Sequence, residues 1–95
     1  MSQTEFPFRL PMGYLDENGT QHTDGTMRLA TADELITALK DHRVQQNSAF
    51  LTVLLLSLSV TRLGEISVIT TKVIEDLFAA DFAYLQEMYN RINTD

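Results

Sequence analysis

The most constraining feature of the chain is an apolar segment, AFLTVLLLSLSV, at residues 49–60. A membrane-spanning helix needs about 20 mostly apolar residues, whereas this segment is shorter and is followed by Arg62 and Glu65. We therefore expect a helix of about sixteen residues, at 48–63, that is buried on most of its surface. A central buried strand is the alternative, because valine and threonine interrupt the leucines. The residues expected at the centre of the core are Phe50, Leu51, Leu54, Leu55 and Leu58, with Leu56 as a further candidate.

The first thirty residues favour extended structure. Apolar side chains alternate with others at Phe6, Phe8, Leu10 and Met12, which is the period of a strand with one buried face. Because Pro7 and Pro11 cannot donate hydrogen bonds to a sheet, this segment is expected to be an edge strand or an irregular extended arm. Residues 18–19 (Asn-Gly) predict a tight turn, and residues 24–25 (Asp-Gly) predict a second one.

The pattern changes to helical spacing after Ala30. The segment TADE fits a capping box, in which Thr31 and Glu34 each bond to the other's backbone amide. A stripe at helical spacing then predicts an amphipathic helix that ends near residues 41–43. Its apolar face would consist of Ala32, Leu35, Ile36 and Leu39.

Further cap signals divide the rest of the chain. Asn47 or Ser48 would cap the apolar helix, Gly64 would break the chain after it, and Thr70 or Thr71 would cap a short helix through residue 78. Asp81 would cap a last helix, with an apolar stripe of Phe82, Leu85, Met88 or Tyr89, and Ile92.

These elements predict the class and the domain organisation. We expect one α+β domain over residues 1–95, because the length is that of a single domain. An extended arm and β-hairpin region, or a short meander of two or three strands, would occupy residues 1–30. A small bundle of about four helices would occupy residues 31–95.

Composition excludes several classes of protein. The net charge is −6, with only seven scattered basic residues, whereas a nucleic-acid binder needs clustered lysine and arginine. Without cysteine, disulfides, thiolate catalysis and cysteine zinc sites are excluded. The first ten residues lack the features of a secretory signal, so we expect a cytoplasmic protein.

No motif indicates catalysis or a cofactor. His22 is expected in an exposed turn and His42 at a helix C-terminus, and neither has the spacing of a metal site or a catalytic triad. The segment DENGT resembles the start of a calcium loop, but Met27 stands where the loop needs a glutamate. The paired acidic residues point in different directions on a helix, and no glycine-rich phosphate loop is present. We therefore expect no enzyme, no cofactor and no metal site.

Apolar residues on more than one side of the last helix suggest a protein interface. Tyr84, Met88 and Tyr89 belong to residue types that adapt well to interfaces, although the same residues could simply close the core. If they form an interface, it would bind a partner or a second copy of the chain.

Several segments together give the sequence a resemblance to a known family. They are similar to segments of small tail assembly proteins, or tail assembly chaperones, of phage tails and related contractile injection systems. The segments are LPMGYLDENGTQHTDGTMRLATADE, DHRV, LLLSLSVTRLG and YLQEMYNRIN. The resemblance covers residues 10–93 and includes no catalytic signature. It implies a non-enzymatic assembly factor that binds a tape measure, tube or baseplate protein in the bacterial cytoplasm, without nucleic acid or membrane.

Under this resemblance the first hairpin and the last helix are the candidate contact surfaces. The residues proposed for contact are Leu10, Met12, Tyr14, Tyr84, Met88 and Tyr89. Asp41, Arg43 and Arg62 could also bind a partner, but internal ion pairs that tie the helices together are expected for at least one arginine.

The alternative is a structural or adaptor component that is retained in the tail or baseplate. In that case the N-terminal arm would add a strand to the exposed sheet edge of a neighbouring protein.

Overall fold

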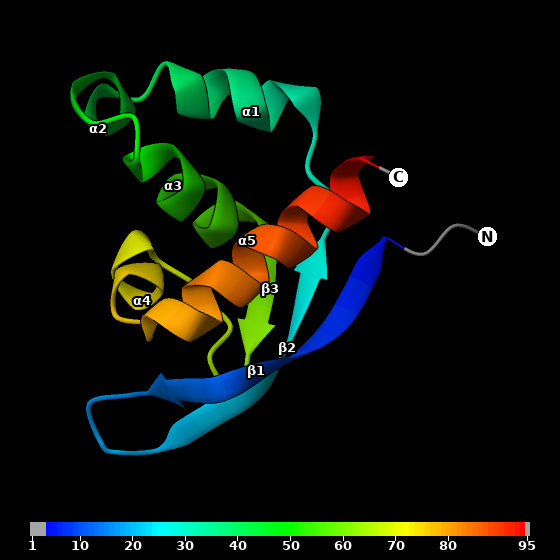
Figure 1. Ribbon diagram of the computed structural model, residues 1–95, viewed down its shortest axis with the longest axis vertical. Helices are drawn as coiled ribbons and strands as arrows, with labels where there is room; N and C mark the ends of the chain where they lie inside the picture. Colours follow the sequence, from blue (N-terminus) through cyan, green and yellow to red (C-terminus); the bar gives the residue numbers. More distant parts are fainter. Residues whose placement is uncertain (1–3, 95) are drawn as a thin grey trace.

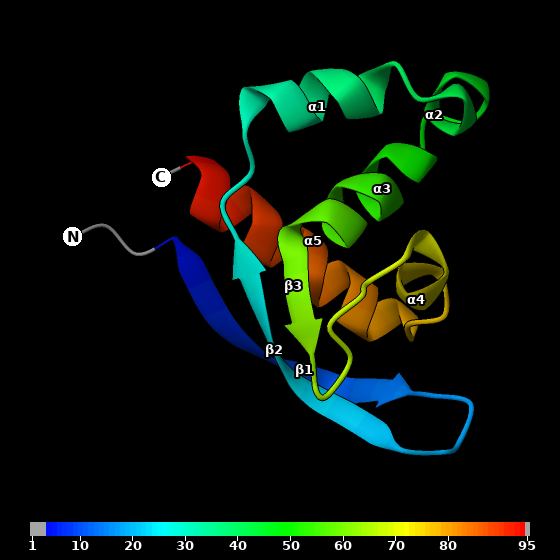
Figure 2. The same ribbon diagram turned by 180° about the vertical axis from the view of Figure 1, so that it is seen from behind.

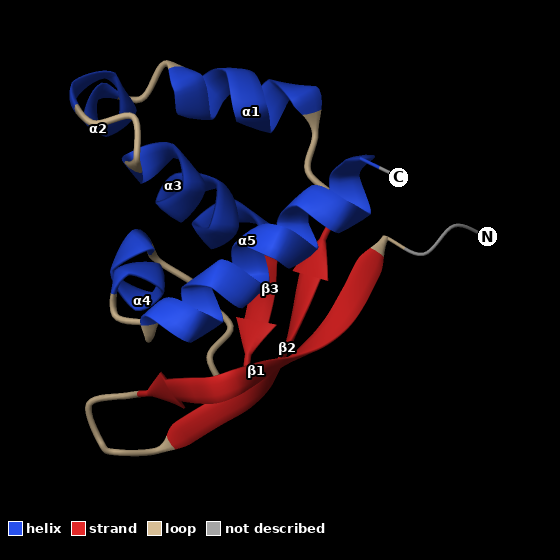
Figure 3. Ribbon diagram, viewed as in Figure 1, coloured by secondary structure: helices blue, strands red, loops and turns tan. Residues whose placement is uncertain are grey.

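The computed structural model describes residues 4–94 and has the expected α+β class. A three-stranded antiparallel sheet, in the order β1-β2-β3, forms one layer and the helices form the other (Figure 1, Figure 3). Five helices are present in the described part, one more than expected. In chain order the elements are β1 (Glu5–Leu15), β2 (Gln21–Arg28), α1 (Ala32–Leu39), α2 (His42–Gln46), α3 (Phe50–Ser59), β3 (Val60–Leu63), α4 (Thr71–Glu75) and α5 (Ala79–Thr94).

The position of the predicted first turn is confirmed, but it is a loop over residues 16–20 and not a tight turn, because Asn18 does not have a positive φ. The predicted second turn is wrong. β1 and β2 are joined at residues 16–20, where Gly19 has a φ of 82° and the Asp16 carboxylate accepts the amides of Asn18 and Thr20, both at 2.9 Å. Gly25 lies inside β2, paired with Phe8 on one side and Leu63 on the other. A Cβ there would lie 2.5 Å from Phe8 Cζ. The glycine therefore makes room for an aromatic ring and does not turn the chain.

β1 is an edge strand and not a free arm. Its residues Phe8 and Leu10 are buried in the core. β2 pairs with one edge of β1, which is an outer strand of the sheet (Figure 2). Leu29 N donates to Thr4 O at 3.1 Å, and this register turns the backbone groups of Pro7 away from β2. Proline costs no ladder bond at that position.

The apolar segment divides between two elements. Its helix, α3, ends at Ser59, and residues 60–63 continue as β3, antiparallel to β2. The expected sixteen-residue helix is therefore too long. Its last four residues form a strand, but β3 lies at the edge of the sheet and is not the central strand of the alternative. The Thr26 and Thr61 hydroxyls meet at 2.6 Å across the two strands.

The main core lies between the sheet, α3, α4 and α5. Met27, Leu56, Leu63, Ile74 and Leu85 are at most 1% exposed there. Of the expected central residues, Leu54, Leu55 and Leu56 are buried, Phe50 and Leu51 are half-buried, and Leu58 is 39% exposed. A separate cluster holds α1 and α2 to α3 and consists of Ala38, Val44, Leu54 and Leu55.

The predicted caps were right at two helices. Thr31 and Glu34 form the capping box of α1, and the Thr70 hydroxyl accepts the amide of Val73 at the start of α4, which ends at Glu75. The N-cap of α3 is Ala49, without a side-chain bond, although Asn47 Oδ1 accepts the amide of Ala49 at 3.2 Å.

Asp81 is not a cap, because α5 already begins at Ala79. Its side chain has no exposed surface, and the two carboxylate oxygens accept the amides of Met12, at 2.8 Å, and Gly13, at 3.0 Å. These amides lie where the β1–β2 register shifts, between Arg9 and Tyr14. The first turn of α5 is therefore bonded to an irregularity of β1 that is 68–69 residues distant in sequence.

Both histidine predictions were wrong. His22 lies inside β2 and is 6% exposed, because its ring packs between Tyr14 and Gly64. Nε2 donates to the Asp16 carboxylate at 2.9 Å, and the amide of Glu65 lies 3.4 Å from Nδ1. His42 is exposed but is the first residue of α2, not the last of a helix.

Candidate partner-binding groove

The apolar stripe predicted for α1 exists but is largely unburied. Leu35, Ile36 and Leu39 are 40%, 50% and 45% exposed, and only Ala38 is buried on this helix. α1 packs on α3 through Ala38 and the rest of the small second cluster, and this leaves most of its apolar stripe exposed. Three large aliphatic side chains on one short exposed helix are unusual without a partner.

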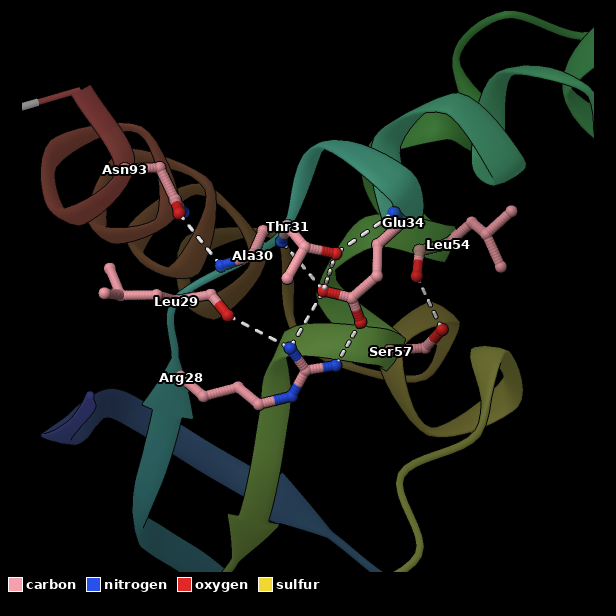
Figure 4. Close-up of polar contacts among 8 residues, drawn as sticks. All are labelled: Arg28, Leu29, Ala30, Thr31, Glu34, Leu54, Ser57 and Asn93. Atoms are coloured by element: carbon pink, nitrogen blue, oxygen red, sulfur yellow. Dashed lines mark hydrogen bonds and ion pairs between the residues drawn. The ribbon is translucent and has the colours of Figure 1, made fainter.

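A network at its N-terminus fixes the position of α1 (Figure 4). The Arg28 guanidinium at the end of β2 makes two bonds to the Glu34 carboxylate, one of them 2.9 Å from Nη1 to Oε1, and also donates to the carbonyl of Leu29 at 3.0 Å. Glu34 in turn accepts the amide of Thr31 at 2.9 Å. The hydrogen bond from Arg28 lowers the pKa of Glu34 to about 2, assisted by the bond from Thr31.

A second contact joins the same segment to α5. The amide of Ala30 donates to Asn93 Oδ1 at 3.0 Å (Figure 4). Asn93 Nδ2 also donates to the carbonyl of Tyr89 at 2.8 Å. The β2–α1 link is thus held to the C-terminal turns of α5, and this sets the spacing between α1 and α5.

Two hollows meet at Tyr89 between these helices, and together we call them the helical groove. One, of about 190 Å³, lies between α3 and α5, and the other, of about 180 Å³, lies between α1 and α5. The half-buried Tyr89 lines both hollows. Burial raises the pKa of its phenol, and the Glu34 charge adds to the effect. The lining contains no charged side chain and consists of Ala30, Thr31, Ala32, Leu35, Leu51, Thr52, Leu55, Leu56, Gln86, Tyr89, Asn90 and Asn93.

A wider hollow lies on the other side of α5, against the start of β1. It measures about 430 Å³ and is lined by Phe6, Pro7, Met88, Arg91 and Ile92. It is open, and Arg91 is its one charged side chain.

The residues proposed for contact do not form one surface. Leu10, Tyr14 and Met88 are 2%, 8% and 3% exposed, so they contact the core and cannot meet a partner without repacking. Met12 is 49% exposed at the irregularity of β1. Tyr84 and Tyr89 are half-buried. Tyr84 packs edge-on against Phe8 at 6.5 Å, and Tyr89 lies in the helical groove.

Sequence reasoning missed the α1 and α3 sides of the groove. Leu51 and Leu55 were expected at the centre of the core and Leu35 on the apolar face of a helix, and apolar stripes usually face inward. The sequence did carry one signal. α1 has a stripe of four apolar residues and α3 is apolar on nearly every side, so the two helices have more apolar surface than they can bury against each other.

The charged residues singled out in the sequence form one ion pair among themselves. Asp41 and Arg43 pair at the start of α2, at 3.1 Å, and the Arg43 guanidinium lies 4.9 Å from the centre of the Phe50 ring. Arg62 donates to the carbonyls of Gly64, at 2.7 Å, and of Asp24 in β2, at 3.5 Å. The ion pair that ties a strand to a helix is instead between Arg28 and Glu34. Across residues 4–94, histidine, aspartate and glutamate side chains form no group of three that could hold a metal ion.

Comparisons with protein-family models, curated proteins and solved structures give no match for this chain. In the described part of the chain, none of the helices has the length and hydropathy required to cross a bilayer.

Proposed function

We propose that this chain is a non-enzymatic assembly factor that holds an apolar helical segment of a partner protein in the helical groove. The observation that carries the proposal is a groove without charged side chains whose lining includes the exposed Leu35 of α1, a helix on which Ile36 and Leu39 are exposed as well. The resemblance of the sequence to small tail assembly proteins supports the same class of function. The partner would be a tape measure, tube or baseplate protein, bound in the cytoplasm while the particle is assembled.

The lining selects the kind of occupant. A groove without charged side chains gives no compensation for a buried charge on a ligand, so an apolar segment fits it better than a nucleic acid or an ionic metabolite. The amide side chains of Gln86 and Asn90 would face the polar flank of a bound helix. With a rise of 1.5 Å per residue, the eight residues of α1 match about two turns of such a helix.

The net charge of −6 supports a holding role. A complex that covers an apolar segment remains dispersed when its outer surface carries excess charge of one sign.

The alternative of a retained tail component has less support from β1. That strand is already paired with β2 and packed on the core, and Pro7 removes an outward donor in the middle of its free edge. A retained component remains an outcome of the experiment below.

The test compares two substitutions on α1 in cells that produce the particle. Leu35→Glu puts a charge in the groove lining, and Thr37→Glu puts the same charge on an exposed position of the same helix. Each variant carries a C-terminal tag, and soluble material is separated from finished tails before bound proteins are identified. We expect a tape measure or tube protein to be recovered from the soluble fraction with the original chain and with Thr37→Glu, and to be lost with Leu35→Glu.

Two results would contradict the proposal. Stoichiometric recovery of the chain in finished tails would indicate a retained structural component. Equal recovery of the partner with Leu35→Glu, in protein whose circular dichroism is unchanged, would place the binding site outside the groove.

A further inference from the structure

A second group of exposed apolar side chains lies away from the groove, at what we call the hairpin end, residues 12–22 and 64–81. Both views show the β1–β2 turn, the loop after β3, α4 and the first turn of α5 at this end of the molecule (Figure 1, Figure 2). Eight large hydrophobic residues are exposed in the described chain, and four of them are here. They are Met12 (49%), Leu15 (52%), Val68 (73%) and Phe78 (45%).

Three contacts hold the segments that carry these side chains together. Met12 N donates to Asp81, one turn after Phe78. Two contacts hold the loop that carries Val68. The amide of Glu65 contacts the His22 ring, and Gly64 N donates to the carbonyl of Asp24 at 2.6 Å. The four apolar side chains are therefore displayed on fixed backbone, which reduces the entropy that binding would cost.

The same end holds most of the charge imbalance of the chain. It contains six of the thirteen acidic residues and one of the seven lysines and arginines, so five of the six net negative charges are located here. Lys72, the one residue counted among the lysines and arginines there, already pairs with Asp76 at 2.8 Å. Glu17, Glu65 and Glu75 are exposed. Apolar side chains among carboxylates complement a segment that is both apolar and positively charged.

We propose that the hairpin end is a second docking surface, which binds a basic amphipathic segment of a protein partner. The uncharged groove would not select such a segment, so the two surfaces differ in the chemistry of what they bind. This inference does not depend on the groove or on the assembly role.

Three labelled peptides of fourteen residues test the proposal by fluorescence anisotropy. One repeats leucine and lysine at helical spacing, one replaces lysine by glutamate, and one replaces leucine by serine. We expect the leucine–lysine peptide to bind at least tenfold more tightly than either of the others. Its affinity should also fall as salt rises from 50 to 300 mM, because the attraction between exposed charges is screened.

Matched variants locate the binding. Val68→Ser and Phe78→Ser should each weaken binding of the leucine–lysine peptide severalfold, whereas Leu58→Ser, at an exposed position of α3 outside the hairpin end and outside the groove lining, should leave its affinity unchanged. Val68 is 73% exposed, so its replacement leaves the core intact.

Several outcomes would overturn the proposal. Equal binding of the serine–lysine peptide would show attraction by charge alone, and a loss with Leu58→Ser as large as that with Phe78→Ser would show that the peptide does not bind specifically at the hairpin end. Sedimentation that shows self-association, abolished by Phe78→Ser, would show that a second copy of the chain occupies this surface. None of these results bears on the groove test with Leu35→Glu, so the two proposals can fail separately.

Discussion

The buried position of the His22 imidazole depends on Gly64, which lies in the connection between β3 and α4. Gly64 has a φ of 59°, and a Cβ built on it would overlap His22 Nδ1. The hydrogen bond from His22 also lowers the pKa of Asp16. One glycine thus leaves room for a side chain that joins the hairpin turn to the loop after β3.

Two alanine substitutions separate crowding from backbone strain. Gly64→Ala should destabilise the fold by about 3–4 kcal/mol, because it combines left-handed strain with displacement of His22. Gly19→Ala should cost only about 1–2 kcal/mol, since its φ is also positive, at 82°, but nothing lies within 4 Å of its added carbon. Urea unfolding measures both values, and equal costs would contradict the role assigned to His22.

Sequence reasoning could not predict these residue contacts. His22 follows a turn signal and Asp81 precedes an apolar stripe, which are the positions of an exposed histidine and a helix cap. Their actual partners, Glu65 and the amides of Met12 and Gly13, lie 43 and 68–69 residues away. Contacts at such separation leave no local pattern in a single sequence.

At the scale of elements, the Arg28–Glu34 pair determines how α1 leaves the sheet. Glu34 belongs to the capping box and to this ion pair at once, and its side chain is only 22% exposed. Because the pKa of Glu34 is about 2 in the folded chain and about 4.5 without its partners, the pair stabilises the fold above pH 4.5. That contribution is lost as the pH falls from about 4.5 through about 2.

Glu34→Gln should therefore have a pH-dependent cost. We expect it to reduce the free energy of unfolding by about 1–2 kcal/mol at pH 7 and to have little effect at pH 2, where Glu34 is half protonated or more. Unfolding of both chains by urea between pH 7 and pH 2 gives the difference at each pH. Asp33→Gln is the control, since Asp33 is an exposed acidic residue of the same first turn. A cost that stays constant across this range would contradict the ionic role of Glu34.

The elements themselves were predictable to different degrees. The sequence predicted the caps at Thr31 and Thr70, the position of the first turn and the strand alternation from Phe6 to Leu10, because these features depend on neighbouring residues. The alternation fails at Met12, which is 49% exposed where the β1–β2 register shifts. The boundary between α3 and β3 was not predictable, because a continuous apolar segment carries neither period and pairing with β2 decides where the helix ends.

At the scale of the whole molecule, the two apolar clusters are expected to differ in stability. The main cluster joins the sheet to α3, α4 and α5, whereas the second joins only α1 and α2 to α3. Leu54 and Leu56 lie on the same helix but belong to different clusters. α1, which forms one wall of the groove, is therefore held in place by the less extensive of the two clusters.

Hydrogen exchange of two alanine variants tests this division. Leu56→Ala, at a side chain with no exposed surface, should cost about 3–4 kcal/mol and speed amide exchange throughout the protein. Leu54→Ala should speed exchange mainly in α1 and α2, because it removes the support beneath them. The same exchange pattern in both variants would show that the clusters unfold as one unit.

The candidate site was predictable from the sequence only in part. The sequence identified the apolar residues of α1, α3 and α5 and suggested an interface on the last helix. Which of these residues remain uncovered depends on how much of α3 the sheet and α5 already occupy, and that is a property of the assembled fold.

The bond between Asp81 and β1 also has a consequence for synthesis of the chain. β1 is synthesised before α5, and Asp81, whose carboxylate binds the β1 amides, follows Met12 by 69 residues. Phe8 and Leu10 of the β1–β2 hairpin therefore stay uncovered until the α5 segment has left the ribosome. The time at which the hairpin folds is set by the synthesis of α5 and not by the synthesis of the hairpin itself.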